Sequence, residues 1–217
     1  MKRIVKYANP KVIAVTGGIG SGQSTVCTRL LERGCRIIDV DKKAKQIINK
    51  DAALQRELKK VFGEKIFSAD GKLNRKLLAQ IAFKEESNTL QLNNLIHPRM
   101  VAEVVEEMES ARFSGKYPLI VIDAALIYEI SIEQMFDAII VVYASMENRI
   151  KRVMERDGLS RREIITRVRR QIPLDDKKQW ADFVVDNNGS LEDLKRQTDQ
   201  IFEKLTVRVQ KARRLRV

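Results

Sequence analysis

A glycine-rich segment near the start of the chain has the composition of a phosphate-binding loop. It reads Gly17-Gly-Ile-Gly-Ser-Gly-Gln-Ser24 and stands between an apolar run and a helical pattern. Glycines allow consecutive backbone N–H groups to turn toward a phosphate, and the N-terminal end of the next helix adds positive potential. The segment therefore predicts nucleotide binding rather than a flexible turn. The residues that we expect to line the phosphates are Gly18, Ile19, Gly20, Ser21, Gly22, Gln23, Ser24 and Thr25.

The loop departs from the pattern GxxxxGK[ST] at one position, where Gln23 replaces the lysine. Lysine would supply a point charge to the β- and γ-phosphates, whereas glutamine offers a neutral N–H donor. A charged hydrogen bond contributes about 1.5–3 kcal/mol and a neutral one about 0.5–1.5 kcal/mol, so binding should suffer less than catalysis. Three explanations stay open: an engineered substitution, a natural loss of activity, or compensation by another cation. Ser24 retains the hydroxyl that would bind Mg²⁺.

Carboxylates follow two of the apolar runs. Asp39 and Asp41 end the sequence Ile38-Asp-Val-Asp41, and strand alternation would place both on one side, near the glycine-rich loop. One of the two could orient an attacking hydroxyl and accept its proton, and the other could hold Mg²⁺ through water, for which Asp39 is the candidate. Asp123 stands where phosphate-loop proteins bind Mg²⁺. The alternative for Asp41 and for Asp123 is a carboxylate that caps the following helix.

Three arginines are spaced to share one face of a predicted helix. Arg149, Arg152 and Arg156 stand at i, i+3 and i+7, within a segment, 149–170, whose net charge is +6. If this face pointed at the active site, its guanidinium groups would neutralise a transferring phosphate. The alternative is a solvated helix face, which such charge runs usually form.

Short apolar runs alternate with longer amphipathic stretches along the chain. The alternation predicts an α/β fold with a doubly wound, parallel five-stranded sheet. Ligands of such sheets bind at the carboxyl ends of the strands, where the loop and the carboxylates fall. The predicted strands are 12–15, 36–39, 119–123, 138–142 and 183–186.

We expect one unit with two insertions in a nucleotide-binding core. A mostly helical insertion, 51–115, should bind the phosphate acceptor, and a basic helical hairpin, 146–171, should form a lid over the phosphates. A basic tail, 208–217, is expected to be a solvated helix end. The core then comprises 11–50, 116–145 and 172–207.

Composition narrows the possible functions. The two cysteines, Cys27 and Cys35, flank no metal-ligand pattern and suggest reduced thiols in the cytoplasm. A single histidine, His97, excludes histidine-pair metal sites, so a metal would be a hard cation on oxygen ligands. No apolar run reaches the roughly 20 residues of a membrane span. Half of the net charge of +12 lies in 149–170, within the expected lid, which argues against nucleic acid as a partner. Trp180 and the phenylalanines are expected in the core.

Taken together, the ordered motifs resemble the dephospho-CoA kinase family, a family of phosphate-loop (P-loop) small-molecule kinases, from position 12 to about position 200. One departure besides Gln23 is Ala124-Ala125, where the family usually has an apolar residue and then proline, which would restrict the turn. The motifs that carry the resemblance are Thr16-Gly-Gly-Ile-Gly-Ser-Gly22, Ile38-Asp-Val-Asp41, Phe62-Gly63, Asp70-Gly-Lys-Leu-Asn-Arg75, Leu92-Asn93, Ile96-His-Pro98, 123–129, Arg149, Arg156, Gln171, Ala181-Asp182 and Asp186-Asn-Asn-Gly189.

The resemblance implies transfer of the γ-phosphate of ATP to the ribose 3′-hydroxyl of dephospho-CoA, the last step of coenzyme A biosynthesis. It implies that Asp41 orients the hydroxyl and that Arg149 and its helix form the lid. Asn187 would lie near the adenine of ATP. The residues that would help hold the acceptor are Arg75, His97 and Pro98. For His97 the alternative is a packed or capping histidine at a helix end.

Other functions remain to be weighed against an active dephospho-CoA kinase. A catalytically weak or inactive relative would bind ATP or a CoA precursor with little turnover. A different small-molecule kinase would keep the loop and lid and change the acceptor insertion. A nucleic-acid-binding module would bind polynucleotides in a salt-dependent manner. The oligomeric state is left open by the sequence.

Overall fold

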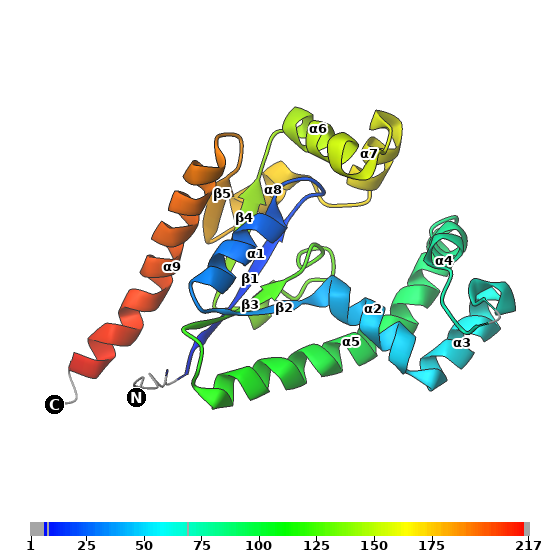
Figure 1. The fold of residues 1–217 in the computed structure, drawn as a ribbon, viewed down its shortest axis with the longest axis horizontal. Helices are drawn as coiled ribbons and strands as arrows, with labels where there is room; N and C mark the ends of the chain where they lie inside the picture. The colour runs from blue at the N-terminus through cyan, green and yellow to red at the C-terminus, as the bar shows by residue number, and fades with distance from the viewer. Residues whose placement is uncertain (1–6, 8, 69, 215–217) are drawn as a thin grey trace. The chain divides into compact units, whose positions relative to one another are not determined.

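The computed structural model in Figure 1 describes residues 7, 9–68 and 70–214, with side-chain burial described up to residue 206. The chain forms two compact units. The first comprises Met1–Ile38 and Met108–Val217, and the second comprises Asp39–Glu107. The basic tail, 208–217, lies outside the residues whose side chains are described.

The first unit is built on a five-stranded sheet. Strand β1 pairs in parallel with β3 and β4, and β4 pairs in parallel with β5. The strand order is β2-β3-β1-β4-β5, which confirms the predicted doubly wound parallel sheet. Its strands are β1 (Lys11–Gly17), β2 (Arg36–Asp39), β3 (Leu119–Asp123), β4 (Ala138–Tyr143) and β5 (Phe183–Asp186).

Valine and isoleucine dominate the three central strands because both faces of the sheet are covered. Two aspartates fix the register where strands begin. Asp137 accepts a hydrogen bond from the backbone N–H of Val12 at 2.8 Å, and Asp182 accepts one from Ile139 at 2.8 Å. These bonds satisfy amides at the amino end of the sheet. Because the strands are parallel, the loops that follow β1, β3 and β4 lie at the opposite, carboxyl end of the sheet.

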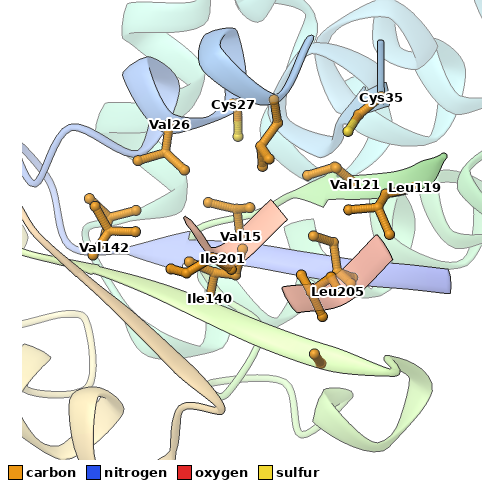
Figure 2. Close-up of a cluster of buried hydrophobic side chains, with 14 of the residues drawn as sticks. Val15, Val26, Cys27, Cys35, Leu119, Val121, Ile140, Val142, Ile201 and Leu205 are labelled. Atoms are coloured by element: carbon orange, nitrogen blue, oxygen red, sulfur yellow. The ribbon is translucent and has the colours of Figure 1, made fainter. Parts of the chain in front are cut away.

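Helices α1 (Gln23–Glu32) and α9 (Leu191–Arg214) pack on the same hydrophobic core. Figure 2 shows side chains of both helices meeting those of the strands, with Val26 from α1, Ile201 from α9, and Val15 and Ile140 from the sheet. Ion pairs between Arg29 and Asp199 join the two helices outside this core, with an N–O distance of 2.6 Å. The core thus holds α1, and with it the glycine-rich loop, firmly against β1.

Helices α6 (Met146–Asp157) and α7 (Arg161–Val168) form the hairpin that follows β4 (Figure 1). Gly158 ends α6 with φ of 66°, and Ser160 caps α7 through a reciprocal capping box with Glu163. Ile150, Val153 and Ile164 bury their side chains between the helices. Short elements complete this unit: the turns of 125–131, the 3₁₀ helix η2 (Glu133–Met135) and α8 (Leu174–Trp180).

The second unit is helical and has a core of its own. Asp51 caps α3 by accepting hydrogen bonds from the N–H groups of Ala53 and Leu54, and it also pairs with Arg99 at 3.0 Å. Arg99 pairs in turn with Glu57 at 2.9 Å, which ties two helices together. The helices are α2 (Val40–Lys50), α3 (Ala52–Phe62), η1 (Glu64–Ile66), α4 (Arg75–Ala82) and α5 (Glu86–Ser114), of which α5 continues into the first unit.

The expectation that Trp180 and the phenylalanines lie in the core is wrong for Trp180, Phe83 and Phe113, whereas Phe62 and Phe67 are buried. Trp180 is 54% exposed and meets the buried Tyr128 edge-to-face with ring centroids 5.4 Å apart, and Phe113 is 85% exposed. Trp180 is the last residue of α8, so its ring covers Tyr128 from outside instead of entering the core. No helix of the described residues combines the length and apolar composition needed to cross a bilayer.

Cys27 and Cys35 form no disulfide, and both are buried in the core of the first unit. Burial raises the pKa of the Cys35 thiol to about 12. Because only the thiolate is nucleophilic, we expect Cys35 not to react with a thiol reagent at pH 8 until the protein unfolds. Absorbance after addition of Ellman's reagent, with and without denaturant, measures this. Rapid modification of Cys35 in the native protein, mapped by mass spectrometry, would contradict it.

Candidate active site

The glycine-rich loop connects β1 to α1 and turns through left-handed backbone conformations. Gly20 has φ of 78° and Gly22 has φ of 97°, which favour glycine over residues with a side chain. Ser21 N–H donates to the Gly18 carbonyl at 2.9 Å, and Thr25 N–H donates to the Gly22 carbonyl at 3.0 Å. Helix α1 therefore begins directly after Gly22, with its N-terminal end at the loop.

Side chains from distant elements approach the loop so closely that its glycines have no room for a Cβ. A Cβ on Gly20 would lie 2.6 Å from the carbonyl oxygen of Arg149. A Cβ on Gly18 would meet the Arg149 guanidinium, and one on Gly22 would meet the amide of Asn187. Backbone conformation and packing together thus favour glycine at Gly20 and Gly22, whereas at Gly18 only the end of the Arg149 side chain is in the way.

Hydrogen bonds from three side chains hold the loop in place. Arg149 Nε donates to the Ile19 carbonyl at 2.8 Å, and Gln171 Oε1 accepts from the Ile19 N–H at 3.1 Å. Asn187 Nδ2 donates to the Ser21 carbonyl at 2.7 Å. The sequence motifs include Gln171, but we predicted no role for it, because nothing local indicates that its amide reaches a loop 152 residues away.

The predicted arginine stripe divides into buried and solvated members. Arg149 is 4% exposed and lies against Gly18, whereas Arg156 is exposed and pairs with Asp157 at 2.8 Å. Arg152 donates to the Asn187 carbonyl at 2.7 Å, and its other terminal nitrogen is buried without a partner among the described residues. The functional interpretation fits Arg149 and Arg152, and the solvated-face alternative fits Arg156.

Arg149 brings an uncompensated positive charge to the loop. Burial lowers the pKa of its guanidinium, and Asp175 opposes this effect from a distance. Among the residues that the structure describes, no carboxylate forms an ion pair with Arg149. A buried cation without a paired anion favours an anionic ligand at this place.

Gln23 contacts the carboxylate that follows the third strand. Its Nε2 lies 2.5 Å from Asp123 Oδ1 and 3.1 Å from the Val15 carbonyl oxygen. The capping alternative for Asp123 is wrong, because turns rather than a helix follow it. A neutral amide is therefore adjacent to the carboxylate at the centre of the site.

The oxygen groups near the loop have the chemistry that Mg²⁺ prefers. Ser24 lies exposed in the first turn of α1, and Asp123 lies at the carboxyl end of β3. The hydroxyl of Ser21 is buried without a hydrogen-bond partner among the described residues, so the loop has unused polar capacity. No group of three or more His, Cys, Asp or Glu side chains within the described part of the chain is arranged to hold a metal by itself. A hydroxyl and a carboxylate fit a cation that completes its shell with phosphate and water oxygens.

The alternation argument for Asp39 and Asp41 is wrong. Strand β2 ends at Asp39 and helix α2 starts at Val40, so Asp41 is in the first turn of a helix. Asp39 is the N-cap, accepting from the Lys42 N–H at 2.8 Å, and the capping alternative for Asp41 therefore fails. Asp41 is exposed overall, yet the protein packed around its carboxyl group raises the pKa of Asp41, and repulsion from Asp39 raises it further.

The residues predicted to hold the acceptor belong to the second unit. Arg75 is exposed at the start of α4, and His97 and Pro98 lie within α5. The helix-end alternative for His97 is wrong, because α5 continues through Pro98 for another four turns. His97 is half-buried, and burial lowers the pKa of its imidazole, which favours the neutral form at pH 7.

A cavity of about 400 Å³ opens beside Arg149 and Gln171 in the first unit. Its wall combines apolar and ionisable side chains. Those that matter chemically are Tyr143, Met146, Arg149, Arg169, Gln171 and Asp175. Arg149 and Gln171 thus line this cavity and also hydrogen-bond to the glycine-rich loop.

Comparison with known proteins places this site in a family. The family model for dephospho-CoA kinase matches residues 11–193. The dephospho-CoA kinase of Arabidopsis thaliana is 36% identical over 201 residues, which cover 93% of this chain and 84% of the relative. That of Carboxydothermus hydrogenoformans is 37% identical over 193 residues, covering 89% and 93%. The chain belongs to the dephospho-CoA kinase family.

Solved structures agree with this assignment. A crystal structure from Thermus thermophilus has 34% sequence identity and a TM-score of 0.79, and the match covers 91% of this chain and 99% of the other. The dephospho-CoA kinase of Campylobacter jejuni has 26% identity and a TM-score of 0.63, with 92% and 99% covered. Members of this family use ATP as the phosphate donor. The glycine-rich loop is the feature of this dephospho-CoA kinase family member that corresponds to such a donor.

Proposed function

We propose that this protein transfers the γ-phosphate of ATP to the ribose 3′-hydroxyl of dephospho-CoA. The observation that carries the proposal is the buried guanidinium of Arg149, which has no ion-pair partner in the described part of the chain and lies against a glycine-rich loop, in a chain that belongs to the dephospho-CoA kinase family. Phosphoryl transfer depends mainly on positioning and on neutralising charge, and this arrangement supplies both to a nucleotide phosphate.

In this proposal the first unit binds ATP. The loop and first helical turn, 18–25, would surround the phosphates, and Arg149 and Arg152 would counter their charge. Asn187 holds the loop through the Ser21 carbonyl, so its role near the adenine would be to shape the pocket. Within this unit Ser24 and Asp123 would hold Mg²⁺, which would supply charge neutralisation at the phosphate oxygens.

Asp41 would orient the 3′-hydroxyl and accept its proton. The raised pKa of its carboxyl group makes it a better proton acceptor than an ordinary aspartate. Arg75, with His97 and Pro98, would hold dephospho-CoA. The hairpin 146–171 would exclude water from the phosphates, because an open site would hydrolyse ATP. The segment 51–115 stays our proposal for the acceptor-binding insertion, and the compact helical unit of the structure runs from Asp39 to Glu107.

The decisive test is product analysis with ATP, Mg²⁺ and dephospho-CoA. We expect equal amounts of ADP and CoA, identified by liquid chromatography and mass spectrometry, and little ADP without the acceptor. Adenosine, gluconate and shikimate serve as competing acceptors and should yield little product. Phosphorylation of one of these in preference to dephospho-CoA would favour a different small-molecule kinase.

Gln23 specifically favours a second candidate, a protein that binds ATP or a CoA precursor with little turnover. Calorimetric titration with ATP and with dephospho-CoA, beside the product assay, separates the two. Tight binding without CoA formation would support the second candidate.

We also propose that the protein acts in the cytoplasm. The buried thiols of Cys27 and Cys35, which form no disulfide, are consistent with that reducing compartment.

A further inference from the structure

The first unit buries a lysine that the proposed mechanism does not use. Lys177, on α8, is 0% exposed. Its Nζ lies 2.6 Å from Glu129 Oε1 and donates to the Ala125 carbonyl at 3.0 Å. Burial lowers the pKa of Lys177, and the bond to Glu129 opposes that effect. An ammonium group is seldom fully buried unless it is paired, because its desolvation is costly.

One connection runs from Lys177 to the beginning of the glycine-rich loop. The Ala125 carbonyl that accepts from Lys177 also accepts from Thr16 Oγ1 at 3.2 Å. Thr16 directly precedes Gly17, and Ala125 is in the turn after β3, two residues beyond Asp123. This turn has alanine at 124 and 125 and therefore lacks the restraint of a proline ring. The ammonium group of Lys177 instead restrains this turn through its hydrogen bond to the Ala125 carbonyl.

A second connection runs through Glu129 to the loop. Glu129 Oε1 also accepts from the Ile172 N–H at 3.0 Å. Ile172 follows Gln171, whose Oε1 accepts from the Ile19 N–H in the loop. The ion pair therefore sets the base of the α6–α7 hairpin and the first part of the loop at the same time.

We propose that Lys177 and Glu129 are positioning residues, whose ion pair holds the glycine-rich loop between the turn after β3 and the base of the hairpin. The effect on kcat rests on the proposed function, whereas the effect on ATP affinity does not. A purely stabilising ion pair is the competing explanation. The two differ because buried pairs are often replaceable by neutral side chains at little cost to stability.

Three variants separate positioning from stability. Lys177→Met keeps the length of the side chain and removes its charge, Glu129→Gln keeps the shape and the acceptor oxygen, and the double variant removes both charges. Urea unfolding gives the stability of each, calorimetry with a non-hydrolysable ATP analogue gives affinity, and product formation gives kcat and KM. Lys195→Met is the matched control, because Lys195 pairs with Glu192 on the exposed surface of α9 at 3.1 Å.

We expect Lys177→Met to lower stability and to reduce both analogue affinity and kcat by about tenfold to a hundredfold, as small displacements of reacting groups do. The double variant should regain stability, since Glu129 no longer remains buried without its partner, but its affinity and kcat should stay low because Ala125 still lacks its ammonium donor. Glu129→Gln should retain most affinity, and Lys195→Met should match the unaltered protein.

Recovery of affinity together with stability in the double variant would overturn the proposal. So would normal affinity in folded Lys177→Met. If Lys177→Met does not fold, the double variant decides the matter alone. If no variant and no unaltered protein forms CoA, the proposed function fails, while the affinities still decide the positioning role.

Discussion

Gln23→Lys is expected to raise kcat for CoA formation by about 10²-fold or more, the effect of one well-placed donor to transition-state charge. In the present structure the amide of Gln23 bonds to Asp123 and to the Val15 carbonyl, and it carries no charge to phosphate. A lysine ammonium would keep a donor near these oxygens and add a positive charge. Affinity for ATP should rise about tenfold, from the difference between neutral and charged hydrogen bonds.

Gln23→Met is the control, because it keeps the length of the side chain and removes the donor. We expect it to lose affinity for ATP relative to the unaltered protein. Steady-state assays of all three proteins at several Mg²⁺ concentrations provide the comparison. Equal kcat values for the unaltered protein and the Gln23→Lys variant would contradict the prediction, and would mean that another cation already supplies the charge. Arg149 is then the first candidate, since it lies unpaired against the same loop.

Asp41→Asn is expected to lower kcat by about 10²–10⁴-fold, the usual contribution of a general base. The KM for ATP should change little, because Asp41 is proposed to act on the acceptor hydroxyl and not to bind ATP. Desolvation of the Asp41 carboxyl group by the surrounding protein raises its pKa, and repulsion from Asp39 raises it further. Only the ionised carboxylate accepts a proton, so kcat should fall as pH decreases through this raised pKa. The residual activity of Asp41→Asn should lack that acidic limb.

Asp39→Asn tests the electrostatic part of this argument. Asparagine caps a helix about as well as aspartate, so α2 should keep its cap. Removing the charge of Asp39 lowers the pKa of Asp41, and the acidic limb should move to lower pH. Profiles of kcat against pH at saturating Mg²⁺ give both results. An unmoved limb in Asp39→Asn, or a persistent limb in Asp41→Asn, would assign the titration to a different group.

The amino-acid sequence alone determined the sheet and the identity of the loop. Continuous Val and Ile runs are stable only where both faces are covered, so 119–123 and 138–142 were recognisable as central parallel strands. The loop was also recognisable, because the positive φ of Gly20 and Gly22 is a local backbone conformation that favours glycine. Such features depend on residues that are adjacent in sequence, so the sequence alone is enough to predict them.

Tertiary structure decided what surrounds the loop. Helical spacing predicted that three arginines share a face, but only packing buries Arg149 and leaves Arg156 in solvent. Strand alternation failed at Asp41 because the chain turns into α2 at its N-cap, Asp39. Gln171 reaches the loop from 152 residues away and Lys177 reaches the turn after β3 from 52 residues away, and their neighbours in sequence reveal neither contact. Spacing along one element specifies the direction of a side chain, whereas its charge environment depends on the other elements that pack against it.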